Sequence, residues 1–442
     1  MKLSSRLLKG IICIQILIIF FQNNFFKINN VSESTALFTN DATILGILIL
    51  ILAGIFYAEK SSNRYFKKFF KYVPGLLLCY FVPSIFNSLG IISAEGSNLY
   101  YVASRYLLPA SLVLLTLSID FKSIINLGPK AIIMFLSGTV GIVIGGPISL
   151  LIASYFGLVP INPDELWRGL TTVAGSWIGG GANQAAMKEM FNVNDTIFSS
   201  MITVDVIVAN IWMAFLLFGA GINKKMDNWL KADSSAITTL KNKLINYKKK
   251  NQRIPSLTDF MVILGIAFGI TGLAHFGADI ITPYIESNFP SLNKFSLTSS
   301  FFWLIVIATT GGLFLSFTKF RKYEGAGAST IGSVFLYILV ATIGMKMDAL
   351  AILDNPGLFI LGAIWMLIHV VILLSVAKFI RAPFFFVAVG SQANIGGAAS
   401  APVVASAFHP SLAPVGVLLA VLGYAVGTYA AWLCGILMQF AS

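Results

Sequence analysis

Long apolar stretches, separated by shorter polar ones, recur along the whole chain. A helix that crosses a bilayer needs about 20 mostly apolar residues, and we count about thirteen stretches near that length. We therefore predict an all-α polytopic membrane protein with about 12–13 transmembrane segments. The first seven lie near 10–27, 41–58, 72–93, 103–119, 130–156, 167–190 and 196–221, and six more lie near 257–284, 299–318, 328–347, 357–380, 384–406 and 412–440.

The polar stretches carry much of the positive charge. The longest, 222–256, contains "YKKKNQR", and the loops at 59–71 and 319–323 are also rich in lysine and arginine. Cytoplasmic loops of membrane proteins carry an excess of these residues. We therefore predict that these loops face the cytoplasm and that 222–256 is a basic cytoplasmic linker.

The composition agrees with a membrane protein. Hydrophobic residues make up 57% of the chain and charged residues 11%, with a mean hydropathy of +0.84. About a quarter of the residues in a soluble domain are charged, so this chain is too apolar for a soluble fold. The formal net charge of +12 is concentrated in the loops. It therefore does not indicate a nucleic-acid partner, and we expect the lipid bilayer as the partner instead.

The start of the chain and its cysteines add little chemistry. The run "MKLSSRLLKGIICIQILIIFFQ" resembles a signal peptide, but no small-x-small cleavage site follows it. We interpret it as a first transmembrane helix. Cys13, Cys79 and Cys434 lie in separate apolar runs, without the spacing of a metal site or a disulfide framework. We expect buried free cysteines and no cofactor.

Two parts of the chain look like copies of each other. "LSIDFKSIINLGP" (117–129) and "IGMKMDALAILDNP" (343–356) are both apolar helix ends that run into a polar turn with proline. A long, nearly uncharged helix follows each turn. "GSWIGGGAN" (175–183) and "GSQANIGGAAS" (390–400) come next, and each precedes one last apolar helix. Paired, glycine-interrupted segments at corresponding places indicate an internal repeat.

The repeat predicts a division into domains, but whether its two copies are inverted or parallel in the membrane stays open. The loop charges favour inverted copies. The span count favours parallel copies, because six spans lie between corresponding points of the two copies. A re-entrant segment, for example 257–284 or a glycine-rich run, would reconcile the two. We predict N-terminal helices at 1–71, a first repeat at 72–221, the linker at 222–256, an extra helix at 257–298 and a second repeat at 299–442.

The two glycine-rich segments are the candidate binding site. Non-helical backbone survives at membrane depth only where protein buries it or water reaches it. Glycine runs also pack helices tightly, but packing needs no amides such as Asn183, Gln184, Gln392 and Asn394. Unwound carbonyls suit a cation, and half-helix N-termini suit an anion. The candidate residues are Ser176, Gly180, Gly181, Asn183, Gln184, Thr203, Asp205, Ser391, Gln392, Asn394, Gly396, Gly397, Ser400 and Thr428.

Asp205 is the most informative charge, because it lies inside the apolar run that follows the first break. An ionisable group at membrane depth is costly and is a functional hypothesis by default. We expect Asp205 to bind sodium or to carry a proton, with Asn183 and Gln392 as further possible sodium ligands. The alternative is a structural hydrogen bond to a neighbouring helix. Residues 382–442 contain no acidic residue, lysine or arginine, so the second break depends on amides, hydroxyls and backbone.

Three other polar residues have simpler expected roles. Lys188 and Glu189 follow the first break, and we interpret them as a helix end at the cytoplasmic surface, with a counter-charge to substrate as the alternative. His369 is alone on an apolar helix. We predict that it is a buried histidine with satisfied hydrogen bonds.

The motifs "GSWIGGGANQAAM" and "VGSQANIGGAASAPVVASAF" resemble the YjcL-like family of uncharacterised bacterial and plastid membrane proteins, domain of unknown function 819. The resemblance runs from about residue 40 to the end. The architecture is similar to that of sodium/bile-acid symporters and cation/proton antiporters. It implies two inverted repeats with crossed broken helices, a moving core (130–221 with 357–440) and a panel (72–119 with 299–347). It also implies a bacterial inner membrane and a possible homodimer.

A secondary active transporter is therefore the first hypothesis. It would be coupled to sodium or protons and would move a small organic solute, preferably an anion, by an elevator-like mechanism. The alternative is a cation/proton antiporter or a channel. The chain lacks the acidic residue often found at the second break of bile-acid symporters and the paired acidic motif of many antiporters. An enzyme is not expected, because H-E-x-x-H, G-x-S-x-G and P-loop motifs do not occur.

Overall fold

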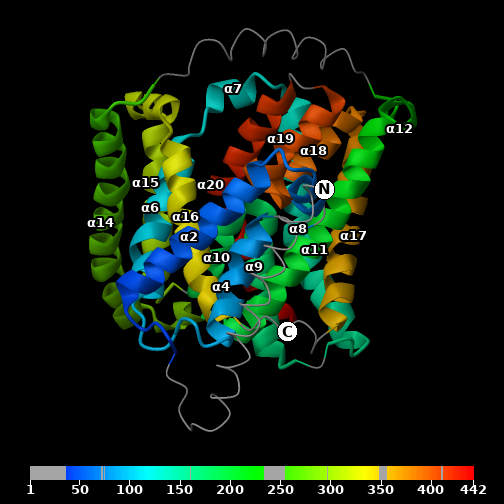
Figure 1. Cartoon of the computed structure of the whole chain (residues 1–442). Helices are drawn as coiled ribbons and strands as arrows, with labels where there is room; N and C mark the ends of the chain where they lie inside the picture. The colour runs from blue at the N-terminus through cyan, green and yellow to red at the C-terminus, as the bar shows by residue number, and fades with distance from the viewer. Residues whose placement is uncertain are drawn as a thin grey trace, which may run out of the picture.

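The computed structural model describes residues 36–442, apart from 71–72, 74, 160, 233–253, 296, 348–355 and 410–411. The predicted helix near 10–27, Cys13 and the "YKKKNQR" run lie outside these residues. The described chain is helical, with one isolated bridge between Phe38 and Ile92 (Figure 1). The first half contains α2 (Asp41–Lys60), α3 (Arg64–Phe70), α4 (Gly75–Ser88), α5 (Leu99–Val102), η1 (Ala103–Leu107), α6 (Leu108–Leu117), α7 (Phe121–Ile125), α8 (Pro129–Tyr155), α9 (Pro163–Gly179), α10 (Gly181–Met190), α11 (Asp195–Gly221) and α12 (Asn223–Leu230).

The second half begins with α14, an unbroken helix of 32 residues that spans Leu257–Asn288. A capping box between Ser256 and Asp259 fixes its start. The remaining elements are η2 (Pro290–Phe295), α15 (Ser300–Ser316), η3 (Lys319–Ala326), α16 (Ala328–Lys346), α17 (Gly357–Ile380), α18 (Phe384–Ile395), α19 (Gly397–Phe408) and α20 (Ala413–Ala441).

The predicted number of transmembrane segments was too high for the described part of the chain. Eight helices there are long and apolar enough to cross a membrane, or up to ten if two bent pairs each count as a span. One reason is that 167–190 and 384–406 are each divided at glycine into two shorter helices. The suggestion that 257–284 re-enters the membrane was wrong, because α14 is continuous.

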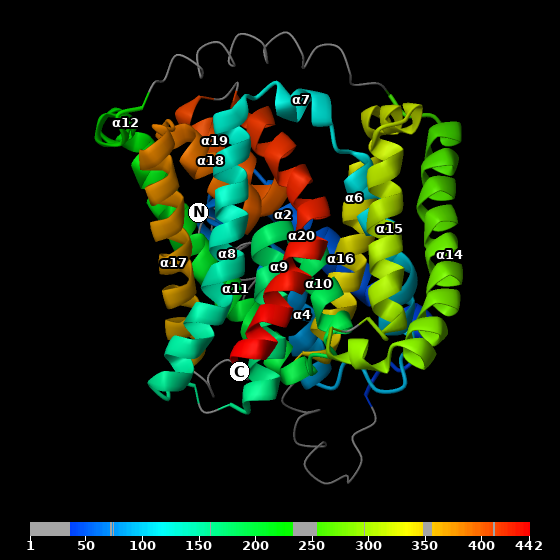
Figure 2. The same ribbon diagram turned by 180° about the vertical axis from the view of Figure 1, so that it is seen from behind.

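The helices pack as two bundles. The α8 bundle contains α8–α11 and α17–α20, in which α8 packs on α17 and α9 packs on α20. The α6 bundle contains α2, α4, α6 and α14–α16, in which α6 lies between α15 and α16. The bundles stand side by side in Figures 1 and 2, and they meet where α10 and α20 face α6 and α15.

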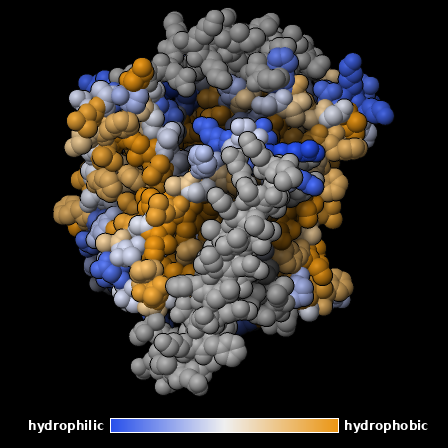
Figure 3. All heavy atoms as spheres, viewed as in Figure 1, coloured by the Kyte–Doolittle hydropathy of each residue, from blue (hydrophilic) through white to orange (hydrophobic). Residues whose placement is uncertain are grey.

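Apolar side chains cover much of the outer surface between the polar ends (Figure 3). Phe215 on α11, Leu273 on α14 and Leu367 on α17 are each more than 60% exposed. Large hydrophobic side chains on the outside are unfavourable in water but favourable in contact with lipid acyl chains. The chain is therefore an integral membrane protein whose helices contact the bilayer.

Glycines allow α20 to approach the end of α9 closely. A Cβ atom on Gly427 would lie 2.6 Å from the Cα atom of Gly179, and a Cβ atom on Gly423 would lie 2.8 Å from the carbonyl oxygen of Ile178. These neighbours are backbone atoms, which cannot move aside as a flexible side chain can. Close backbone approach through small residues is how helices associate in a bilayer.

We predict that Gly427→Ala lowers the free energy of unfolding by about 1–3 kcal/mol, because the added methyl group overlaps the backbone of α9. Thermal unfolding of the purified protein in detergent measures this effect. Gly46→Ala is the matched control: Gly46 lies on α2 with nothing within 4 Å of an added Cβ, so we expect no destabilisation. Equal unfolding midpoints for Gly427→Ala and the wild type would contradict the packing described.

Candidate functional site

Both glycine-rich segments interrupt a helix. Helix α9 ends at Gly179 and α10 begins at Gly181, while Gly180 between them has φ of +75°. Helix α18 ends at Ile395 and α19 begins at Gly397, which has φ of +55°. Positive φ angles are strained for residues with a side chain, which explains glycine at these two positions.

The two interruptions meet beside α20. A Cβ atom on Gly423 would lie 2.8 Å from the carbonyl oxygen of Ile178 and 3.5 Å from that of Ala393. Ile178 is in the last turn of α9 and Ala393 is in the last turn of α18. The last carbonyl groups of a helix lack intrahelical donors and carry its negative partial charge. Two negative helix ends therefore lie on either side of Gly423.

Asp205 on α11 is buried in a cage of donors next to the first interruption. The indole Nε1 of Trp177 donates to Oδ1 at 2.7 Å, and Nε2 of Gln184 donates to Oδ2 at 3.0 Å. The Ser176 hydroxyl also hydrogen-bonds to the carboxylate. Three donors stabilise a buried anion, as a desolvated carboxylate requires. Asp205, Ser176 and Gln184 thus form one cluster, which Trp177 completes.

Asn183 joins the first interruption to α20. Its Nδ2 donates to the carbonyl oxygens of Gly179 and Tyr424, each at 3.1 Å. Its Oδ1 accepts a hydrogen bond of 2.6 Å from the hydroxyl of Thr428. The amide thus satisfies backbone that the interruption exposes and fixes it to the neighbouring helix.

Asn394 does the same at the second interruption. Its Nδ2 donates to the carbonyl oxygens of Gly390 and Phe135, each at 2.9 Å, and its Oδ1 accepts from Thr139 at 2.7 Å. Each asparagine therefore bonds to the carbonyl four residues before it, to a carbonyl of a neighbouring helix, and to the threonine four residues after that carbonyl. We call these two sets the asparagine clamps.

Ser391 belongs to a third cluster. Its hydroxyl accepts from Nε1 of Trp212 at 2.8 Å and lies 2.8 Å from Nε2 of His369. The other ring nitrogen of His369 lies 3.0 Å from the carbonyl oxygen of Gly138. The expectation of a buried histidine with satisfied hydrogen bonds is confirmed.

Gln392 is less completely satisfied. Its Nε2 donates to the hydroxyl of Ser400 at 2.6 Å across the second interruption. Its Oε1 is buried and has no hydrogen-bond partner within the described residues. Because a buried acceptor without a donor is costly, this oxygen is a candidate contact for a bound ion or solute.

The possible sodium ligands do not share one set of contacts. Asp205 bonds to its donor cage, Asn183 to Thr428 and Gln392 to Ser400. No group of three or more His, Cys, Asp or Glu side chains in the described chain could hold a metal ion. Thr203 donates to the carbonyl oxygen of Ser199, one turn earlier in its own helix, and not to the Asp205 carboxylate. Gly181 and Gly396 belong to the interruptions themselves.

Lys188 and Glu189 do not mark a surface end, so that interpretation was wrong. The side chain of Lys188 is only 7% exposed, and its Nζ lies 2.9 Å from Asp195 and 3.0 Å from the hydroxyl of Tyr100. Arg105 of η1, which leads directly into α6, forms a 2.6 Å ion pair with Glu189. Tyr80 on α4 also donates to Oε1 of Gln184, at 3.5 Å. Polar contacts therefore join α10 to the α6 bundle.

Several contributors were missed from the sequence. They are Trp177, Tyr80, Thr139, Trp212 and Arg105. Trp177 had a usable signal, because an indole N–H beside glycines at membrane depth needs an acceptor. Tyr80, Thr139 and Arg105 lie on other helices, and Trp212 lies one to two turns after Asp205 on α11. No local pattern links any of them to its partner beside the interruptions.

The comparisons with known proteins show a membrane-protein relative and a family of unknown function. The family model described as "Protein of unknown function (DUF819)" matches residues 46–440. The chain belongs to the DUF819 family. This DUF819 protein is also 25% identical over 374 residues to "Uncharacterized membrane protein YjcL" of Bacillus subtilis (strain 168), covering 81% of this chain and 88% of that protein. Membership supports a multi-span membrane protein and assigns no substrate to it.

We predict that Thr428→Val and Thr139→Val each lower the free energy of unfolding by about 1–3 kcal/mol. Each leaves the amide oxygen of a buried asparagine without its donor while nearly preserving shape. Thermal unfolding in detergent measures the loss. Thr310→Val is the control, because Thr310 is exposed and bonds to the exposed Tyr429, so its effect should stay within about 0.5 kcal/mol. Equal effects at all three positions would contradict the clamp assignment.

Proposed function

We propose that this DUF819 protein is a secondary active transporter in a bacterial inner membrane. The observation that carries the proposal is the meeting of two interrupted helices beside Gly423, with the buried Asp205 next to one of them. Interrupted helices at the bilayer midplane are typical of transporter binding sites. The order of elements supports an internal repeat, since α8 to α11 corresponds to α17 to α20, with an interruption between the second and third members of each set.

Sodium or a proton is the proposed coupling ion. Asp205 would carry the proton, or its charge would balance a cation bound nearby. For sodium, the unpartnered Oε1 of Gln392 and the carbonyl ends of α9 and α18 are suitable oxygen donors. The amide oxygen of Asn183 already accepts a hydrogen bond from Thr428, which favours a structural role for that residue. Gln392 is therefore the better sodium ligand of the two amides.

The proposed motion is a shift of the α8 bundle, as the core, against the α6 bundle, as the panel. Three polar pairs link α10 to the panel side: Arg105 of η1 with Glu189, Tyr100 of α5 with Lys188, and Tyr80 of α4 with Gln184. Apolar packing lies beside them, because one buried apolar cluster contains residues of both bundles. A shift of the core would therefore break these polar pairs and slide along that apolar surface.

A small organic anion is the proposed solute. Helices α10 and α19 begin at the interruptions, and the N-terminal end of a helix carries a partial positive charge. Tyr424 lies between them: a Cβ atom on Gly180 would be 3.7 Å from its ring, and its hydroxyl bonds to the backbone of Ala398. This side chain therefore contacts both interruptions where a solute would bind.

We predict that Asp205→Asn abolishes the response of the protein to the coupling ion. The amide keeps the size of the carboxylate but removes its charge and directs an N–H group at a cage of donors. The measurement is the thermal unfolding midpoint of purified protein in sodium chloride against potassium chloride, at pH 6 and pH 8. Wild-type protein should respond to sodium or to pH, whereas Asp205→Asn should respond to neither.

Asn210→Ala is the control for that variant. Asn210 lies on the same helix, but within the described residues its side chain bonds only to the carbonyl oxygen of Val206, so this variant should respond as the wild type does. If Asp205→Asn also responds like the wild type, the role of Asp205 in coupling is refuted. If the wild type responds to neither ion, the coupling itself is refuted.

A further inference from the structure

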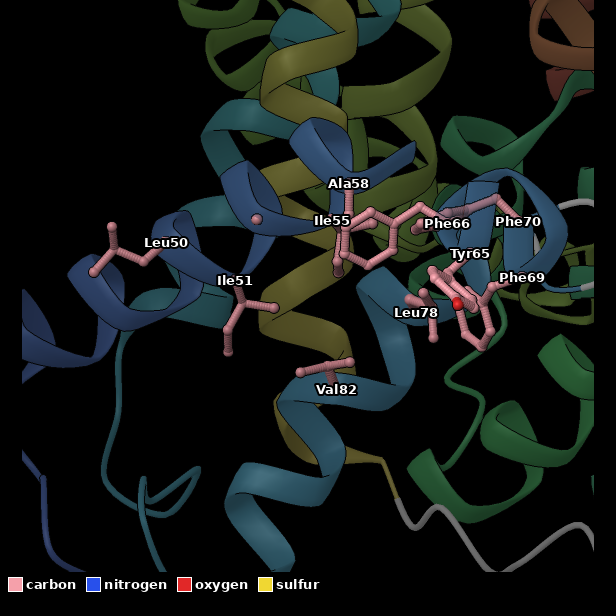
Figure 4. Close-up of a pocket in the computed structure, with 11 residues that line it drawn as sticks. Leu50, Ile51, Ile55, Ala58, Tyr65, Phe66, Phe69, Phe70, Leu78 and Val82 are labelled. Atoms are coloured by element: carbon pink, nitrogen blue, oxygen red, sulfur yellow. The ribbon is translucent and has the colours of Figure 1, made fainter. Parts of the chain in front are cut away.

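An apolar groove is drawn in Figure 4, and none of its lining residues belongs to either helix interruption. It has a volume of about 550 Å³ and is formed by side chains of α2, α3 and α4. Its lining is apolar except for Tyr65, which is 83% exposed. A pocket of this volume holds a small ligand, but its walls offer almost no polar group to orient one. The groove therefore suits a hydrocarbon chain.

Helix α3 gives the groove a charged rim. It lies at 92° to α4, so it runs across the end of that helix. Tyr65, Phe66 and Phe69 line the groove. At 100° per residue, Arg64, Lys67 and Lys68 lie on the opposite face of the helix. All three cations are exposed, and so is the nearby Lys60.

Helix α3 thus has the two faces of an interfacial helix. Aromatic side chains on one face of α3 would reach the acyl region, while lysine and arginine on the other face would lie among the headgroups. Glu59 is also exposed beside the rim, but four cations between residues 60 and 68 outnumber it. The basic loop 59–71 is predicted to face the cytoplasm, where anionic lipids are enriched.

We propose that this groove binds one acyl chain of an anionic phospholipid, whose headgroup lies against Arg64, Lys67 and Lys68. The occupant comes from the bilayer, because exposed apolar residues such as Leu50 on α2 line the groove. Charge complementarity selects the headgroup, and the apolar walls hold the chain. This site is separate from the solute site, so each can fail without the other.

Two variants test the two halves of the site. Arg64→Gln/Lys67→Gln/Lys68→Gln removes the charges, and Gly54→Leu fills the groove. Gly54 lines the groove, and an added Cβ there would have nothing within 4 Å, so the leucine enters open space. Titration of phosphatidylglycerol against full-length protein, followed by native mass spectrometry, gives the affinity. Each variant should weaken binding at least about ten-fold.

The matched controls make the same kinds of substitution at positions outside the groove and its charged rim. Lys122→Gln/Lys319→Gln/Lys322→Gln removes as many exposed charges elsewhere, and Gly46→Leu adds the same side chain to α2 outside the groove. Both should bind phosphatidylglycerol as the wild type does. Phosphatidylcholine with the same acyl chains should bind wild-type protein at least about ten-fold more weakly. Equal affinity for the two lipids, or unchanged affinity of Gly54→Leu, overturns the proposal.

A photo-crosslinker identifies the occupant directly. Phe66→p-benzoylphenylalanine places the reactive group in the groove of the full-length protein in phosphatidylglycerol vesicles. A phospholipid adduct is the expected product. An adduct to a peptide of this chain, from the same molecule or a second copy, would show that protein fills the groove and would overturn the proposal.

Discussion

The need to satisfy backbone hydrogen bonds inside a bilayer governs this structure. Two helices stop and restart in the α8 bundle, and each stop exposes N–H and C=O groups that lipid cannot bind. The asparagine clamps satisfy some of these groups. Asn183 and Asn394 each donate to a carbonyl oxygen near its own interruption and to one on a neighbouring helix. Their threonine partners come from α20 and α8. The interruptions are thus held by side chains of the same bundle.

The packing of the bundle follows from this arrangement. Amide clamps reach only a few ångströms, so the helices that carry their partners must approach closely. Gly423 and Gly427 let α20 lie against the end of α9. The same closeness brings the carbonyl ends of α9 and α18 together and leaves the donor cage of Asp205 beside them. Polar groups cost free energy when they are buried without partners. Here they are concentrated at one place, as in a binding site for an ion or solute.

The sequence predicted the parts of this site that depend on local pattern. Glycine at Gly180 and Gly397 coincides with positive φ angles, and the polar residues beside them are buried. The charge of Asp205 within an apolar run also marked it correctly as a buried group, although its role in coupling stays a prediction. His369 was correctly expected to be buried and satisfied.

Long-range partners could not be predicted in this way. Trp177 donates to a residue 28 positions away, and Thr139 to one 255 positions away, and no periodicity encodes such pairs. Lys188 was misjudged because a lysine near a helix end is usually solvated, whereas here Asp195 and Tyr100 surround it. The number of spans was overestimated because hydropathy does not distinguish an unbroken helix from one divided by glycine.

The central claim is that the two bundles move against each other in response to a coupling ion. Pulsed electron paramagnetic resonance tests it with spin labels at Leu273→Cys on α14 and Val371→Cys on α17, both exposed, after replacement of the native cysteines. The account predicts two distance populations whose ratio changes with sodium or pH. Labels at Phe215→Cys and Val371→Cys, both in the α8 bundle, should keep one distance. A single, unchanged distance between α14 and α17 under every condition would contradict the account.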